Sequence, residues 1–192
     1  MCYNLSVKFI VLRNFKMQTL SYVLSTLGLA SVVAASLIKG RKMKQILFFV
    51  FCSNVLFATS YMFAGSGING AASCYLGGLQ AIINYFFDSK DKPLPKWLVA
   101  LYAIGFVAVN LIFGGFNALT VLAIVASLSF VMCIGQKSGA KYRFWTIVNS
   151  VLWCIYDLLS KSYGAFVSHI ILLVFTVVGM IIHDRKKEKV NE

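Results

Sequence analysis

The sequence predicts an all-α transmembrane protein of seven helices, built as two parallel three-helix repeats joined by a linker helix (3+1+3). Three observations predict this fold: an apolar composition, seven apolar runs of membrane-spanning length, and an ungapped self-similarity at an offset of 95 residues. Hydrophobic residues make up 59% of the 192 residues and charged residues 12%, whereas a soluble domain has about 45–50% apolar and ~25% charged residues. The excess apolar surface requires a lipid bilayer as its solvent.

Seven apolar runs follow one another from Leu20 onward, and each is long enough to cross a ~30 Å hydrocarbon core as a helix. They lie at residues 20–38, 46–64, 68–87, 97–113, 118–134, 144–159 and 164–182. Backbone groups in lipid must be hydrogen-bonded within their own segment, so all seven runs are predicted to be helices. The only two prolines, Pro93 and Pro95, lie in the loop after the third run.

The same runs give the domain boundaries. Residues 1–16 mix apolar and basic side chains, and their apolar run before Arg13 is too short to span a membrane. We therefore expect a poorly ordered N-terminal extension over residues 1–16. The remaining chain divides into a first repeat over 17–92, a linker helix over 93–115, a second repeat over 116–183 and a charged cytoplasmic tail over 184–192.

Lysine and arginine alternate between the two sides of the predicted bundle. The loops after the first, third and fifth runs and the tail carry four, three, three and four of them, whereas the loops after the second, fourth and sixth runs carry none, none and one. The positive-inside rule then predicts a cytoplasmic C-terminus and an N-terminus outside. The net charge of +12 is accounted for by these membrane-side residues, so no nucleic-acid partner is expected.

Rare polar residues coincide when the chain is shifted on itself by 95 positions. The matched pairs are Gly40 with Gly135, Lys42 with Lys137, Phe49 with Phe144, Asn54 with Asn149, Tyr61 with Tyr156, Ser73 with Ser168 and Lys92 with Lys187. Two three-helix units in the same orientation need an odd number of helices between them. The pattern predicts a parallel repeat whose axis lies along the membrane normal.

A polar and aromatic stripe marks the sixth run, where Asn149, Trp153, Tyr156 and Asp157 fall on one helical face. Such a stripe turns away from lipid, toward neighbouring helices or a wet cavity. Asn54 and Asn149 are expected at matching depths across a central space, where two amides could bind a polar, uncharged solute. The alternative is that both amides join helices, each contributing about 0.6–2 kcal/mol.

The aromatic members of the stripe also allow two interpretations. Trp153, Tyr156 and Tyr61 could stack on a sugar or heterocycle, or they could belong to the aromatic belt at the outer interface. The belt is favoured for the two tyrosines and the cavity for Trp153, which lies closer to the middle of its run.

Four further polar residues are candidates for the same cavity. Asp157 is the only acidic residue inside a predicted span. It is interpreted either as a carboxylate that couples transport to a proton or cation, or as a residue at the rim of the bundle beside Lys161 at i+4. Gln80 and Asn84 share a face of the third run, and His169, on the seventh, could titrate near neutrality or bond a carbonyl.

No metal, cofactor or enzymatic site is predicted. The five cysteines show no CxxC spacing, and no serine, histidine and aspartate are spaced as a nucleophilic triad. A less favoured alternative is a membrane enzyme that uses Asp157 and His169 as acid and base.

The local motifs resemble a known family. Trp153-Cys154-Ile155-Tyr156-Asp157 followed by Ser160-Lys161-Ser162-Tyr163-Gly164 is similar to the YgjV family of bacterial inner-membrane proteins, over residues 17–185. The 3+1+3 plan resembles the fold clan of SWEET and SemiSWEET sugar transporters and PnuC vitamin transporters (MtN3-like). The resemblance implies a bacterial inner membrane and a transporter-like fold with no established substrate. The chain departs from the SWEET pattern because its predicted helices contain no proline.

The sequence thus predicts a transporter or facilitator of a small polar, neutral solute, moving through a cavity between the two repeats. PnuC-like proteins share Asn, Trp and Tyr in equivalent helices, so a flat aromatic solute is the second choice. The alternative is a non-transporting membrane scaffold that binds a protein partner. The clan accommodates monomers and larger assemblies, which leaves a homo-oligomer open.

Overall fold

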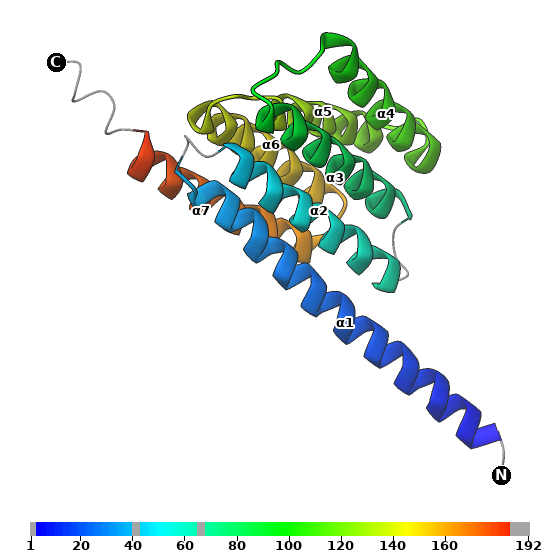
Figure 1. Cartoon of the computed structure of the whole chain (residues 1–192). Coiled ribbons are helices and arrows are strands. Elements are labelled where there is room, and N and C mark those ends of the chain that lie inside the picture. The colour runs from blue at the N-terminus through cyan, green and yellow to red at the C-terminus, as the bar shows by residue number, and fades with distance from the viewer. Residues whose placement is uncertain (1–2, 40–42, 65–67, 185–192) are drawn as a thin grey trace.

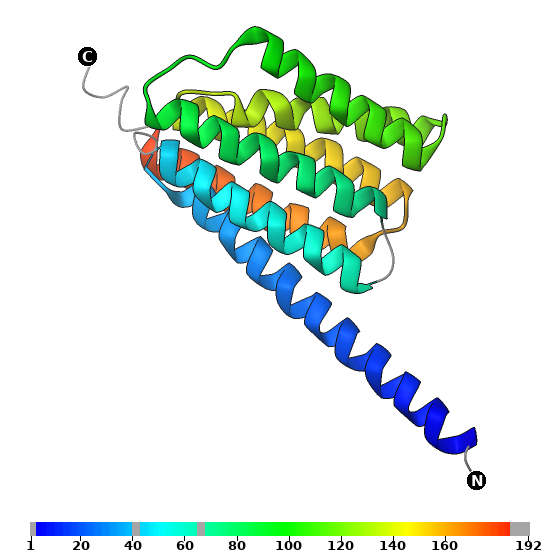
Figure 2. The ribbon, with the colours of Figure 1, turned by 45° about the vertical axis from the view of Figure 1, so that its right-hand side comes forward.

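The computed structural model describes residues 3–39, 43–64 and 68–184, with side chains for residues 16–39, 43–63 and 70–184, and within these ranges it contains seven α-helices and no strand. The helices are α1 (Tyr3–Leu37), α2 (Met43–Ala64), α3 (Ile68–Ser89), α4 (Lys96–Gly114), α5 (Ala118–Ile134), α6 (Gly139–Leu159) and α7 (Tyr163–His183). Helices α2 to α7 lie side by side in one bundle (Figures 1 and 2). The all-α prediction and the seven helices are confirmed.

Four stretches in the described part of the chain are long and apolar enough to cross a membrane by length and composition. They are Lys16–Leu37, Met43–Phe63, Lys96–Gly114 and Tyr163–His183. Helix α5 is apolar but has only 17 residues. Helices α3 and α6 are longer, at 22 and 21 residues, but they bury polar side chains such as Asn84 and Asp157. Their lower hydropathy therefore reflects polar faces turned into the bundle.

Neighbouring helices in the sequence are neighbours in space. Helix α2 packs between α1 and α3, and α6 packs between α5 and α7. These two groups meet where α1 contacts α7 and where α3 contacts α5. Helix α4 packs on α3 and α5 at the edge of the bundle (Figure 1).

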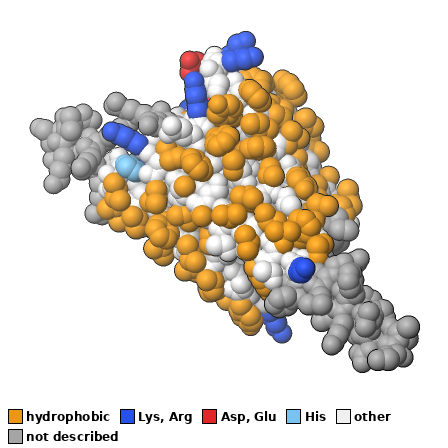
Figure 3. All heavy atoms as spheres, turned by 60° about the horizontal axis from the view of Figure 1, so that its bottom comes forward, with side chains coloured by type: hydrophobic (Ala, Val, Ile, Leu, Met, Phe, Trp, Pro, Cys, Tyr) orange, Lys and Arg blue, Asp and Glu red, His pale blue; other side chains and the backbone are white. Residues whose placement is uncertain are grey.

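The chain alternates between two ends of the bundle. We call the end where α1, α3, α5 and α7 finish the basic end, because its described residues include Lys39, Lys90, Lys92 and Lys137. The far end is where α2, α4 and α6 finish, with the turns at 115–117 and 160–162. Apolar side chains cover much of the surface between these ends, and basic side chains lie at its margins (Figure 3).

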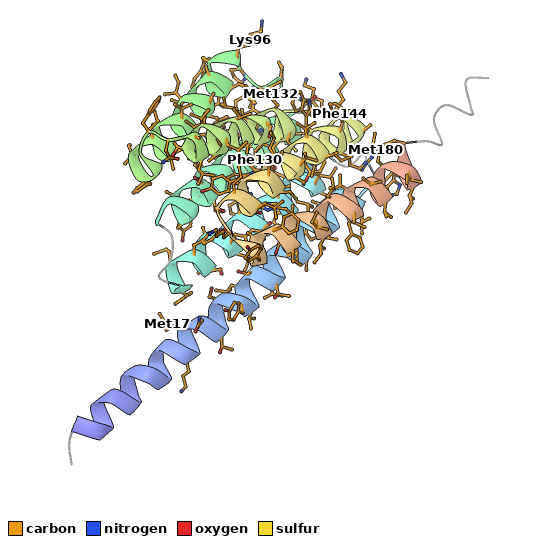
Figure 4. The ribbon with its side chains drawn as sticks, turned by 180° about the vertical axis from the view of Figure 1, so that it is seen from behind. Met17, Lys96, Phe130, Met132, Phe144 and Met180 are labelled. Carbon is orange, nitrogen blue, oxygen red and sulfur yellow. The ribbon has the colours of Figure 1, made fainter. Side chains whose placement is uncertain are left out.

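The apolar core lies nearer the basic end. One cluster joins Ala35, Met43, Ile46, Leu47, Val50, Ala81, Cys133, Ile134 and Tyr142, which come from five helices. A second joins Leu98, Tyr102 and Phe106 of α4 to Val131 of α5. Phe130 packs against both clusters and lies inside the bundle (Figure 4). Because lipid tails are as apolar as these side chains, close van der Waals packing within the clusters, rather than escape from water, joins the two groups of helices.

Helix α1 begins at Tyr3, within the segment 1–16 for which a poorly ordered extension was expected. It runs without a break from Tyr3 and projects beyond the bundle at the far end (Figures 1 and 2), and the exposed Met17 lies on its projecting side (Figure 4). The reason is local, because α1 contains no proline and a single glycine, Gly28. Its 35 residues reach about 52 Å, well beyond a ~30 Å hydrocarbon core. Residues 1–2 and all of the predicted tail except Asp184 lie outside the described residues.

Candidate functional site

A buried acid–base pair lies at the far end, between α6 and α7. His169 Nδ1 donates a hydrogen bond of 2.7 Å to Asp157 Oδ2. The side chain of Asp157 is 4% exposed and that of His169 is 27% exposed. The carboxylate is thus enclosed, while the imidazole keeps one open side.

The turn between α6 and α7 sets this pairing. Lys161 adopts the left-handed conformation, with φ of 58°. The backbone amide of Ser162 donates to the carbonyl of Asp157 at 2.8 Å, and that of Ser160 donates to Tyr156 at 2.8 Å. These bonds satisfy carbonyls left open at the end of α6. The short turn brings α7 back alongside α6, so that His169 meets Asp157.

Aromatic rings cover the imidazole. The ring of Trp153 stacks on that of His169, with centroids 5.9 Å apart and planes at 8°. Tyr156 meets Trp153 edge-on at 5.3 Å. The imidazole is thus in contact with the indole ring of Trp153 on one face and with the carboxylate of Asp157 at Nδ1.

Tyr61 of α2 completes what we call the Asp157 cluster, which consists of Tyr61, Trp153, Tyr156, Asp157 and His169. Tyr61 lies near Asp157 and Tyr156, and its ring packs so closely on α3 that a Cβ at Gly70 would lie 3.2 Å from it. The cluster therefore draws on both groups of helices. The structure brings together five residues that the sequence had singled out on three separate runs.

The two asparagines of the predicted central pair bond elsewhere. Asn149 donates to the carbonyl of Ala126 at 2.7 Å and to the hydroxyl of Ser129 at 2.9 Å, both on α5. Asn54 donates to Val50 of its own helix at 2.9 Å. Its amide oxygen packs so closely on α3 that a Cβ at Gly77 would lie 2.7 Å away. In this structure both amides hold helices within one group.

Gln80 and Asn84 of α3 lie where the two groups meet. Gln80 donates to the carbonyl of Val131 at 3.5 Å, and Asn84 donates to that of Ile134 at 2.8 Å, both on α5. Both side chains are buried, and the Oε1 of Gln80 and the Oδ1 of Asn84 accept no hydrogen bond from the described residues. Buried oxygens of this kind need a donor, such as water or a solute hydroxyl.

The sequence analysis missed a second buried ion pair, at the basic end. Arg143, fully buried in α6, donates through Nε and Nη2 to Asp184 at 2.9 and 2.6 Å, and through Nη1 to the carbonyl of Ile38 at 3.0 Å. His183 donates to the carbonyl of Leu37 at 2.8 Å. We call these three side chains and the end of α1 the Arg143 junction.

Two signals in the sequence pointed to the Arg143 junction. From the sequence, Arg143 was predicted to be a loop charge and Asp184 part of the charged tail. Arg143, however, precedes Asp157 by 14 residues, which returns a helix to nearly the same face. Asp184 follows the last apolar run directly, on the same predicted side of the membrane as Arg143.

Lys161 does not pair with Asp157 as the sequence allowed, since the ionic partner of this carboxylate is His169. Lys161 is exposed in the turn. Asp157 is therefore enclosed and paired with His169 near the end of α6, a contact that neither interpretation of this carboxylate included.

Comparison with known protein families gives a match over most of the chain. A family model described as a bacterial inner membrane protein, Imp-YgjV, matches residues 6–187. No curated protein and no solved structure matches the chain. The family and the apolar helices together make this a multi-pass protein embedded in the lipid bilayer of the bacterial inner membrane.

Proposed function

Because the chain belongs to the Imp-YgjV family of bacterial inner membrane proteins, we propose that it moves a small polar, neutral solute across that membrane. The Asp157 cluster is the observation that carries this proposal. Ionisable side chains within membrane helices are costly, and by default they indicate a functional site. Here an enclosed carboxylate, an imidazole and three aromatic rings gather at one end of the bundle.

The packing supports two rocking units in a 3+1+3 arrangement. A two-fold axis along the membrane normal would exchange α1 with α5, α2 with α6 and α3 with α7. Under this symmetry the contact between α1 and α7 has a counterpart between α5 and α3. Both contacts are present in the structure. In this arrangement α2 and α6 face each other across the axis, and the solute passes between them.

The charge distribution supports an orientation. The basic end faces the cytoplasm under the positive-inside rule, which leaves the Asp157 cluster and the start of α1 outside. The apolar core, nearer the basic end, closes the inner half, so solute first meets the cluster from outside. Trp153 packs on the solute, and Tyr61 and Tyr156 bond its hydroxyls. Gln80 and Asn84 offer free acceptors further along the seam of α3 and α5.

Accessibility of single cysteines tests this path. In a variant lacking the five native cysteines, one cysteine at Tyr156 or Asn149 is treated with a charged methanethiosulfonate reagent from each side of the membrane. We expect Tyr156→Cys to react from outside, while Ile155→Cys, exposed on the same helix, stays protected by lipid. Protection of both Tyr156→Cys and Asn149→Cys from both sides would favour the non-transporting scaffold.

Vesicle swelling tests movement of solute directly. Proteoliposomes are mixed with glycerol, xylitol or glucose, and light scattering follows their entry. We expect entry of at least one of these solutes to exceed that of empty vesicles, and Trp153→Ala to slow it about tenfold, the effect of about 1.4 kcal/mol. A flat aromatic solute, nicotinamide, is included as the second choice. No entry above empty vesicles for any of the four would contradict the proposal.

The enzymatic alternative required Asp157 and His169 to lie within one hydrogen-bond network, and they are 2.7 Å apart. We nevertheless propose that the chain is not an enzyme. Asp157 is hydrogen-bonded to Nδ1 of His169. An enzyme of this kind would need a nucleophilic hydroxyl or thiol hydrogen-bonded to Nε2, and among the described residues no such group is bonded there.

A further inference from the structure

We propose that Asp157 and His169 together form a proton-exchange site, which takes one proton from the aqueous phase at the far end. Its use to drive solute rests on the proposed function, whereas proton binding itself does not. Two features of the pair support exchange: the carboxylate is enclosed, and the imidazole is partly open.

The hydrogen bond fixes where the proton enters. Asp157 Oδ2 occupies Nδ1 of His169, and no described residue bonds Nε2. The neutral imidazole therefore carries its hydrogen on Nδ1 and presents a lone pair at Nε2. The site lies close to the aqueous phase, since Asp157 is two residues before the end of α6 and His169 is six residues after the start of α7.

Groups around the pair do not fix its charge. The titratable side chains that face it are Tyr61 of α2 and Cys154 and Tyr156 of α6, with Cys74 of α3 beyond Tyr61. Lys161, the nearest basic residue in the sequence, is exposed in the turn. No permanent cation among the described residues is bonded to the carboxylate, so the proton on the pair decides whether its net charge is zero or −1.

The step is a proton binding and release. The empty state is an anionic Asp157 with a neutral His169, and a proton from water adds to Nε2 to give the aspartate–imidazolium pair. Trp153 stacks on the ring that receives this proton, and Asp157 holds the opposite nitrogen. The empty state leaves a buried anion in the last turn of α6, where the helix dipole opposes negative charge. Loss of the same proton from Nε2 to water restores the empty state.

Nuclear magnetic resonance of the full chain in lipid nanodiscs tests the proton site without any solute. The chain has two histidines, His169 and His183, so ¹⁵N-histidine gives two ring systems that His183→Gln assigns. We expect His169 to change charge once between pH 5 and 9, and Asp157→Asn to alter that titration but not that of His183. A single charge state of His169 throughout, or an unaltered titration in Asp157→Asn, would overturn the proposal.

Swelling with xylitol or glucose under an imposed pH gradient tests coupling. We expect an acidic exterior to raise the initial rate of entry at least fivefold over equal pH, and Asp157→Asn to abolish this ratio. Asp88→Asn is the matched control, because Asp88 is also a carboxylate in the last turn of a helix but lies at the basic end. Titration without solute entry would retain the proton site and reject transport. Entry with no response to pH would retain transport and reject coupling.

Discussion

The two ion pairs at opposite ends of α6 are built for different tasks. Arg143 makes two hydrogen bonds to Asp184 and one to the end of α1, whereas His169 makes a single hydrogen bond to Asp157. Arginine stays charged in proteins, but histidine gains and loses its charge near neutral pH. The Arg143 junction is therefore a fixed connection, whereas the Asp157 pair is the one whose charge we propose to change.

The two pairs also connect different parts of the bundle. The Arg143 junction joins α6 and α7 to the last carbonyls of α1, where a cation complements the negative end of the helix dipole. The Asp157 pair joins only α6 to α7, within one group of helices. An ion pair thus takes part in joining the two groups at the basic end, whereas the ion pair at the far end lies within one group.

Arg143→Met should give the largest effect on stability. Removal of one member of a buried pair leaves Asp184 and the carbonyl of Ile38 without their donors, and we expect the free energy of unfolding to fall by about 3 kcal/mol. Unfolding by SDS in dodecyl maltoside micelles measures this change. Lys141→Met is the control, since Lys141 is exposed on the same helix, and it should change stability by about 0.5 kcal/mol or less. Equal effects of the two substitutions would show that the junction is not a lock.

Gly179→Ala should have the second-largest effect. A Cβ at Gly179 would collide with the backbone carbonyl of Ser36, so α1 and α7 would have to separate. We expect a loss of about 2 kcal/mol in the same unfolding assay. Gly164→Ala serves as the control on the same helix, because a Cβ there meets nothing within 4 Å. If Gly179→Ala is as stable as Gly164→Ala, close contact of α1 with α7 does not hold the basic end.

His183→Ala should give the smallest effect of the three. It removes one half-buried hydrogen bond to the carbonyl of Leu37, which we expect to cost about 1 kcal/mol of unfolding free energy. His183→Gln can still donate to that carbonyl and should recover part of the loss. A loss as large as that of Arg143→Met would mean that His183, rather than the arginine, secures the end of α1.

The sequence predicted the helices better than their partners. Hydropathy and the pattern of basic loops were enough for seven helices, because both depend on local composition. The face shared by Trp153, Tyr156 and Asp157 followed from helical periodicity. The sequence did not predict the partner of Asp157. That partner depends on the left-handed turn at Lys161, which sets the register of α7 against α6.

Arg143 illustrates the opposite error. A basic residue at the start of an apolar run is typical of a membrane anchor. Only the packing of α1 against α7 shows that Arg143 is enclosed. The sequence likewise found Asn149, but not that its donors are taken by Ala126 and Ser129. A single apolar sequence does not predict the long-range partners of its polar residues, because many helix–helix registers bury the same apolar area.

The contact of Gly179 with the backbone of Ser36 gives the bundle a pivot. Backbone atoms in contact cannot be compressed, so α7 can tilt about this point more easily than it can slide past it. His169 lies ten residues from Gly179, a lever arm of about 15 Å. A tilt of the group of α5, α6 and α7 by about 10° would then carry the imidazole, together with Asp157, about 2.6 Å relative to α1. A small rotation at the basic end would thereby become a larger displacement of α7 relative to α1 at the far end.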